Sequence, residues 1–128
     1  MQVRILVTGS RDVHPNCIGK VWRTLDSLVT KAALREGTTA KDVLMLVGDA
    51  RGIDTWTIMW SRSRGIKYKK YVADWDTHGD AAGCLRNTDM VRRAHYCIGF
   101  WNGISTGTAD AIISSRSKRI PVKVIDIY

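Results

Sequence analysis

Apolar residues in this chain fall into short uninterrupted runs that alternate with longer amphipathic segments. A run of about five apolar residues is too short for a typical helix and predicts a buried strand. On this basis strands are predicted at residues 3–7, 43–47 and 96–101. Residues 66–72, which alternate partly, and residues 122–127 are predicted to be strands with a wetter face. The segments between them repeat apolar residues at three- and four-residue spacing, which predicts helices.

Capping residues set the expected limits of the first two helices. Asn16 is expected to cap the first helix, because its side chain can accept a hydrogen bond from the first turn, and Gly37 is expected to close it. Gly65 is expected to end the second helix.

The second half of the chain contains a longer polar segment and two further predicted helices. Residues 73–83 are polar and contain glycine, and they are predicted to form a long loop. A third helix is expected from about Leu85 to Ala94. In the last helix, we expect Ala109, Ile112 and Ile113 to face inward.

Strict alternation of strands and helices predicts an α/β protein with a Rossmann-like, doubly wound, five-stranded parallel sheet. The expected strand order is 3-2-1-4-5, because this order places the third and fifth strands, which carry lysines, at the edges. A chain of 128 residues supports one good core, so residues 1–128 are expected to form a single domain.

In such a sheet, ligands bind outside the carboxyl ends of the strands, where the winding reverses. Three loops are expected to meet there, and each combines glycine with hydroxyl, arginine or acidic side chains. This combination is typical of phosphate binding and predicts a nucleotide or phosphosugar ligand. The candidate residues are Thr8, Gly9, Ser10, Arg11, Gly48, Arg51, Gly52, Asp54, Gly103, Thr106, Gly107 and Thr108.

Several common kinds of ligand-binding and catalytic site are disfavoured, because their sequence motifs are missing. The chain has neither GxGxxG nor GxxxxGK[ST], which disfavours an ordinary dinucleotide fold and a Walker nucleotidase, and it has no GxSxG elbow. It has no long apolar run and no basic-then-apolar leader, so no membrane association and a cytoplasmic location are expected. The three cysteines lack zinc spacing and an even count, which predicts reduced thiols.

The chain carries a formal charge of +8 that is spread along the sequence rather than gathered in one tail. As a signal for nucleic acid it is weak, because no recognised nucleic-acid motif accompanies it. Asp74, Asp76 and His78 could present metal ligands if residues 74–78 were extended. We favour solvated loop residues there and predict no metal.

Five collinear motifs resemble the SLOG superfamily, and within it the YspA/YpsA-related SLOG proteins, which are small and often encoded by phages or bacteria. They are Thr-Gly-Ser-Arg at 8–11, Gly-Asp-Ala-Arg-Gly-Ile-Asp at 48–54, Ala-Asp-Trp-Asp-Thr-His-Gly at 73–79, Ala-Gly-Cys-Leu-Arg-Asn at 82–87 and Gly-Thr at 107–108. The resemblance implies a Rossmann-like sheet that binds nucleotides or nucleotide-derived signals, with roles in signalling or phage–host conflict. It adds Asp76 and Asn87 to the candidate ligand-binding residues.

Related phosphoribohydrolases cleave the base from a nucleoside monophosphate with an arginine and a PGGxGTxxE motif. Here Gly107 and Thr108 match, but Ala111 occupies the glutamate position and Asp110 precedes it. A one-residue shift rotates a helical side chain by about 100°. Arg86 and Asp110 are the catalytic candidates of this alternative. Enzymatic activity is left open, and no cofactor is assigned.

Other interpretations stay open. Arg51 could simply neutralise Asp49 and Asp54, and Asp54 could cap its helix instead of binding ribose hydroxyls. Trp75 and Trp101 follow strands and could stack on a base. Single-stranded nucleic-acid binding is a third hypothesis, because of the charge and because DNA-processing DprA proteins share this fold in their core. The oligomeric state, including a homo-oligomer, stays undetermined.

Overall fold

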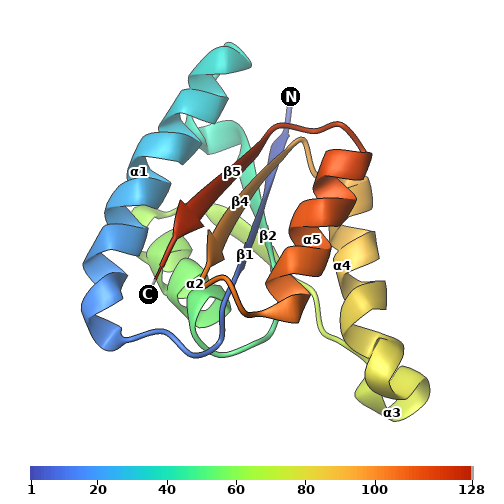
Figure 1. Ribbon diagram of the computed structural model, residues 1–128. Coiled ribbons are helices and arrows are strands. Elements are labelled where there is room, and N and C mark those ends of the chain that lie inside the picture. Colours follow the sequence, from blue (N-terminus) through green and yellow to red (C-terminus); the bar gives the residue numbers. More distant parts are fainter. Residues whose placement is uncertain (128) are drawn as a thin grey trace.

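Strand β1 (Val3–Gly9) lies at the centre of a parallel sheet, with β4 (Tyr96–Trp101) beside it, as the computed structural model, which describes residues 1–127, shows (Figure 1). The sheet has five strands in the order β3-β2-β1-β4-β5. The remaining strands are β2 (Val43–Val47), β3 (Lys67–Lys70) and β5 (Val122–Asp126). The predicted fold class and strand order are therefore confirmed.

The register of the central strands explains why their sequences are almost wholly apolar. Val7 of β1 lies beside Val47 of β2 and Ile98 of β4, and all three are buried. Both faces of these strands are covered by helices, so each residue meets a hydrophobic layer whichever way its side chain points. The lysines of β3 are exposed at one edge, as the sequence predicts.

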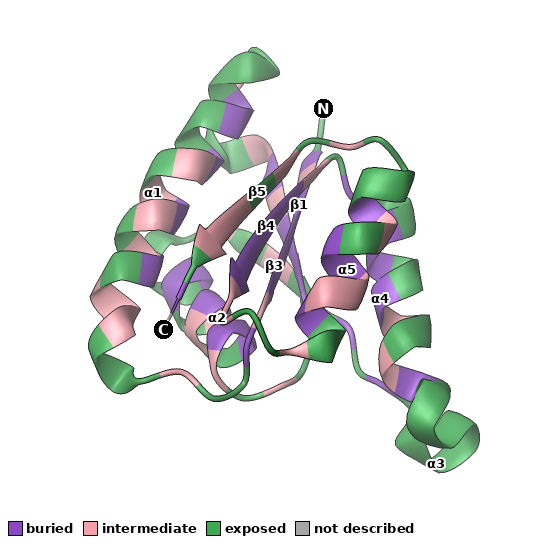
Figure 2. Cartoon of the chain, in the orientation of Figure 1, coloured by how far each residue is buried: buried purple, intermediate pink, exposed green. Residues whose placement is uncertain are grey.

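Two helices cover each face of the sheet (Figure 1). Helices α1 (Ile18–Arg35) and α2 (Ile53–Arg64) lie on one face, and α4 (Ala82–Arg93) and α5 (Thr106–Ser117) on the other. The buried sides of the helices turn toward the strands (Figure 2). Within residues 1–127, no helix is both long and apolar enough to cross a membrane.

The first helix begins differently from the prediction. A 3-10 turn, Pro15–Cys17, precedes α1, and the ring nitrogen Nδ1 of His14 accepts a hydrogen bond from the backbone N–H of Asn16. Asn16 is therefore not the cap. The end of α1 matches the prediction, since Gly37 adopts a φ of 74° just beyond it, and Gly65 ends α2 in the same left-handed region.

The predicted long loop at residues 73–83 is wrong, because most of this segment is helical. Asp74 caps a one-turn helix, α3 (Trp75–His78), which leads through a 3-10 turn (Gly79–Ala81) directly into α4 at Ala82. No apolar period marks these two short turns, because none of their residues is buried. Strand β3 is also shorter than the predicted 66–72.

The inward face of α5 is rotated from the predicted one. Ile112 is buried against β4, where Gly99 makes room for it, but Ile113 is 62% exposed. The rest of the buried face consists of Ala111 and of two small polar side chains, those of Thr108 and Ser115. Apolar spacing alone misplaces this face because buried serine and threonine resemble surface residues in the sequence.

Candidate functional site

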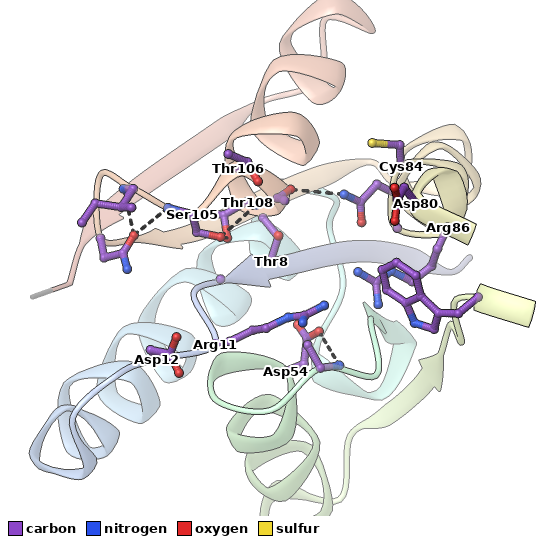
Figure 3. A pocket seen from close by; sticks show the side chains of 18 residues that line it. Thr8, Arg11, Asp12, Asp54, Asp80, Cys84, Arg86, Ser105, Thr106 and Thr108 are labelled. Atoms are coloured by element: carbon purple, nitrogen blue, oxygen red, sulfur yellow. Dashed lines mark hydrogen bonds between the residues drawn. The ribbon is translucent and has the colours of Figure 1, made fainter. Parts of the chain in front are cut away.

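A cleft of about 580 Å³ lies at the carboxyl ends of the central strands, on the side where the winding reverses between β1 and β4 (Figure 3). Its lining comes from four parts of the chain: the exit of β1, the turn between β2 and α2, the α3–α4 segment, and the loop that begins α5. The lining residues are Thr8, Gly9, Arg11, Asp12, Ala50, Asp54, Trp75, Asp80, Gly83, Cys84, Arg86, Asn87, Asn102, Ile104, Ser105, Thr106, Gly107 and Thr108.

The beginning of α5 forms one wall of the cleft. Ser105 caps this helix, because its Oγ accepts a hydrogen bond from the N–H of Thr108, and Asn102 Oδ1 accepts from the N–H groups of Ile104 and Ser105. The N–H groups of Thr106 and Gly107 belong to the first turn, which has no acceptors within the helix. No acidic residue lies in this turn. The wall therefore offers backbone donors and a favourable helix dipole to an anion.

Close backbone packing holds the floor of the cleft. Gly52 has a φ of 76° and lies against the loop after β1, where a Cβ would be 2.4 Å from the carbonyl oxygen of Arg11. The N–H of Ile53 donates to the carbonyl of Ser10 at 3.3 Å. Ser10 itself is buried, and its Oγ accepts from the N–H of Asn102. These contacts tie the three predicted loops into one rigid base.

A carboxylate and a guanidinium approach each other across Gly48. A Cβ on Gly48 would lie 2.6 Å from Asp54 Oδ2 and 2.9 Å from Arg86 Nη1, so the glycine leaves the space that both groups use. Asp54 Oδ2 accepts a hydrogen bond from the N–H of Ala50 at 3.1 Å. Arg86 donates to Asp49 Oδ1 at 2.6 Å, and its Nε is buried without a partner in the described chain.

Burial dominates the chemistry of Asp54. Asp54 is only 5% exposed, and the loss of hydration raises the pKa of its carboxyl to about 6. The hydrogen bond from Ala50 and the charges of Arg86 and Arg11 act in the opposite direction, and Asp49 adds to the rise. Arg11 reaches toward Asp54 across the cleft (Figure 3). The cleft thus contains a desolvated acceptor between two cations.

Asn87 connects α4 with α5. It is 3% exposed, and its Nδ2 donates to the carbonyl of Gly107 at 3.2 Å and to Asp110 Oδ2 at 3.0 Å. Asp110 is not among the lining residues of the cleft. This amide fixes the start of α5 relative to α4, so Asn87 positions the anion-facing wall as well as lining the cleft.

The structure brings together about half of the candidates that the sequence suggests. The lining includes Thr8, Gly9, Arg11, Asp54, Arg86, Asn87, Thr106, Gly107 and Thr108. Seven others lie outside it, namely Ser10, Gly48, Arg51, Gly52, Asp76, Gly103 and Asp110. Of these, Ser10, Gly48 and Gly52 shape the floor from behind.

Arg51 illustrates why position in a loop does not decide the direction of a side chain. It donates to Asp12 at 2.7 Å, with its side chain 69% exposed. Because both groups are solvated, this ion pair contributes little to the stability of the fold.

Asp76 lies in the helical turn α3, so the extended arrangement required for metal binding by Asp74, Asp76 and His78 is not present.

Sequence reasoning did not select several lining residues, including Asp80, Gly83, Cys84, Asn102, Ile104 and Ser105. Asn102 carried a usable signal, because it directly follows a buried strand at the switch point. Residues 82–87 form one of the five motifs, but the place of Gly83 and Cys84 in the cleft follows from the unexpected helical turns after β3.

A doubly wound parallel sheet with a polar cleft at its switch point defines a Rossmann-like ligand-binding domain. The chain belongs to the YspA, cpYpsA-related SLOG family, whose model matches residues 3–78. It is 32% identical over 125 residues to the Gene 61 protein of Mycobacterium phage D29, and the match covers 93% of each chain. The family expected from the motifs is therefore confirmed.

Two solved structures share the fold. DNA processing protein A (DprA) from Streptococcus pneumoniae has a TM-score of 0.74 and 15% identity, over 96% of this chain and 50% of that chain. DprA from Helicobacter pylori, described for its unique single-stranded DNA binding mode, has a TM-score of 0.66 and 12% identity, over 95% of this chain and 64% of that chain. The chain thus spans only part of each DprA chain, and the likeness is one of fold.

Proposed function

We propose that the cleft binds a nucleotide or nucleotide-derived molecule through its phosphate and sugar. The observation that carries this proposal is the approach of Asp54 and Arg86 across Gly48, in the same cleft as the first turn of α5. Backbone N–H groups and Arg11 suit a phosphate, and a buried carboxylate that accepts only one hydrogen bond in the described chain suits sugar hydroxyls. SLOG family membership supports the same ligand class.

Thermal unfolding against a panel of ligands tests this proposal. The panel contains nucleoside monophosphates, NAD, ADP-ribose, cyclic nucleotides and ribose 5-phosphate. A ligand at one hundred times its Kd stabilises the folded state by about 2.7 kcal/mol, which raises Tm by several degrees. No shift with any member, together with no heat of binding in calorimetry, would contradict the proposal.

Replacing Arg86 with methionine is expected to weaken ligand binding about tenfold or more, because a charge-assisted hydrogen bond is worth about 1.5–3 kcal/mol. Titration calorimetry with the best ligand of the panel measures this loss. Arg92→Met is the matched control, since it also removes one cation and one ion pair, with Asp89, and neither residue lines the cleft. Equal losses in the two variants would indicate general electrostatics and would count against the cleft.

A phosphoribohydrolase activity is the enzymatic alternative, in which Arg86 steadies the phosphoribosyl group and Asp110 replaces the missing glutamate. Asp110 is bonded to Asn87 and does not line the cleft, which counts against this assignment. Incubation with each nucleoside monophosphate, followed by chromatography for free base, decides the matter. Binding without release of any base leaves the protein a binder.

Nucleic-acid binding has a separate basis. Residues 61–72 contain five cations and no acid, and Lys67, Lys69 and Lys70 are exposed along the free edge of β3. Phosphate neutralisation predicts binding to single-stranded oligonucleotides that weakens steeply as salt rises. An absence of binding at low salt would remove this candidate. The phage relative supports a role in phage–host conflict or nucleotide signalling. Both a nucleotide and a nucleic acid fit such a role as ligands.

A further inference from the structure

Trp75 is a large aromatic side chain at the mouth of the cleft. It begins α3, it is 47% exposed, and it lines the cleft together with Gly83 and Cys84. Its ring carbon Cη2 lies 3.5 Å from the place that a Cβ on Gly83 would take. The ring therefore rests partly on the backbone of α4, and nearly half of the residue's surface remains open to solvent.

The backbone beneath Trp75 is held in place on both sides. Before it, Ala73 is buried, and the N–H of Tyr71 donates to the carbonyl of Val47 at 2.8 Å. After it, Asp74 closes the turn, since its Oδ1 accepts from the N–H of Thr77 and its carbonyl accepts from the N–H of His78. The indole is thus presented from a fixed turn, as a stacking surface needs to be.

The cleft offers a different kind of group for each polar part of a nucleotide. Its lining includes Thr106 and Thr108 at the start of α5, Cys84 and Arg86 of α4, and Thr8, Arg11 and Asp54 (Figure 3). The backbone N–H groups at the start of α5 suit a phosphate, and the carboxylate of Asp54 suits sugar hydroxyls. Trp75 lies beside Gly83 near the start of α4.

We propose that Trp75 is the surface on which a planar aromatic base stacks, so that the ligand is a nucleotide rather than a phosphosugar. The inference rests on the proposed function and adds the base to it. Every nucleobase has a flat π face, and stacking on an aromatic side chain is tolerant of which base is present. Ile104, an 81% exposed apolar side chain, also lines the cleft.

Comparison of ligands with and without a base tests this assignment. The probes are the four ribonucleoside 5′-monophosphates and ribose 5-phosphate, titrated into the wild-type chain, Trp75→Phe and Trp75→Ala. Loss of one stacked base weakens binding by about 5- to 150-fold. We expect Trp75→Ala to lose this factor for the nucleotides and less than about twofold for ribose 5-phosphate, which has nothing to stack. Trp75→Phe should retain most of the affinity.

Two controls separate stacking from general damage. Leu85→Ala removes an exposed apolar side chain that lies on α4 and does not line the cleft, and it should leave all five affinities unchanged. Quenching of tryptophan emission by nucleotides should disappear in Trp75→Phe and persist in Trp56→Phe, because Trp56 packs against the core outside the cleft. Unchanged Tm values show that each variant is folded.

The outcomes distinguish this inference from the function on which it rests. If ribose 5-phosphate binds the wild-type chain as tightly as the nucleotides, or if Trp75→Ala weakens both kinds of probe equally, the stacking role is wrong and phosphate and sugar binding stands. If no member of the ligand panel binds, including NAD, ADP-ribose and the cyclic nucleotides, the proposed function and the stacking role both fall.

Discussion

Replacing Gly52 with alanine is expected to destabilise the protein by about 4 kcal/mol or more, through backbone strain and overpacking together. Gly52 has a φ of 76° and a ψ of −124°, a combination that residues with a Cβ rarely adopt. The new methyl group would also lie 2.4 Å from the Arg11 carbonyl oxygen and 2.6 Å from that of Ser10. Backbone atoms cannot rotate away, so the floor of the cleft must open. Urea unfolding measures the loss.

Gly65→Ala is the matched control for this effect. Gly65 also has a positive φ, of 66°, but apart from its chain neighbours no atom of residues 1–127 lies within 4 Å of the place its Cβ would take. It therefore reports the conformational cost alone, about 1 kcal/mol. If both variants lost the same stability, the close approach between the two loops would have no energetic weight, and the rigid floor inferred from it would be wrong.

Replacing Asp54 with asparagine is expected to stabilise the protein at neutral pH by up to about 3 kcal/mol. Burial raises the pKa of this carboxyl from its ordinary value near 3.8 to about 6, so ionisation opposes folding. An amide of the same shape can still accept the hydrogen bond from Ala50 without carrying a charge. Denaturant unfolding at pH 7 measures the gain, and a large loss would contradict the desolvation argument.

The pH dependence of the free energy of unfolding provides a second test of the raised pKa of Asp54. Below about pH 4 the carboxyl is protonated in both the folded and the unfolded chain, and it costs nothing. Between about pH 4 and 6 the folded chain keeps the proton that the unfolded chain has lost, so the contribution of Asp54 to stability falls as pH rises and then levels off. Asp54→Asn should remove this decline. Asp12→Asn, which changes an exposed carboxylate on the rim, should keep it.

Because the buried carboxylate of Asp54 lowers the stability of the fold, we expect it to have a role in ligand binding. If Asp54 accepts hydroxyls of the sugar, the variant that gains stability should lose affinity for the ligand found in the nucleotide panel. Titration of the best ligand into Asp54→Asn tests this. Equal affinity in the variant and the wild-type chain would indicate that the charge serves only the local packing near Arg86 and Ala50.

Much of the fold and part of the site followed from the sequence, for reasons visible in particular residues. Three mainly apolar runs correspond to β1, β2 and β4, and two segments interrupted by charged residues correspond to β3 and β5. The lysines of residues 67–70 correctly indicated an edge strand, because an interior strand has no solvated side for them. Since parallel strands direct their exits to one edge, Arg11, Asp54 and Thr108 could be expected near one another before any coordinates.

What the sequence alone determined was therefore the order and type of the main elements and the edge of the sheet where polar loops meet. Only the tertiary structure decided which side chains turn into the cleft: Arg51 turns to Asp12, Asp110 turns to Asn87, and Arg86 reaches Asp49 and the space beside Gly48. It also decided that residues after β3 coil into α3 and carry Trp75 to the mouth. Backbone periodicity is a local property, whereas side-chain direction depends on partners distant in the chain.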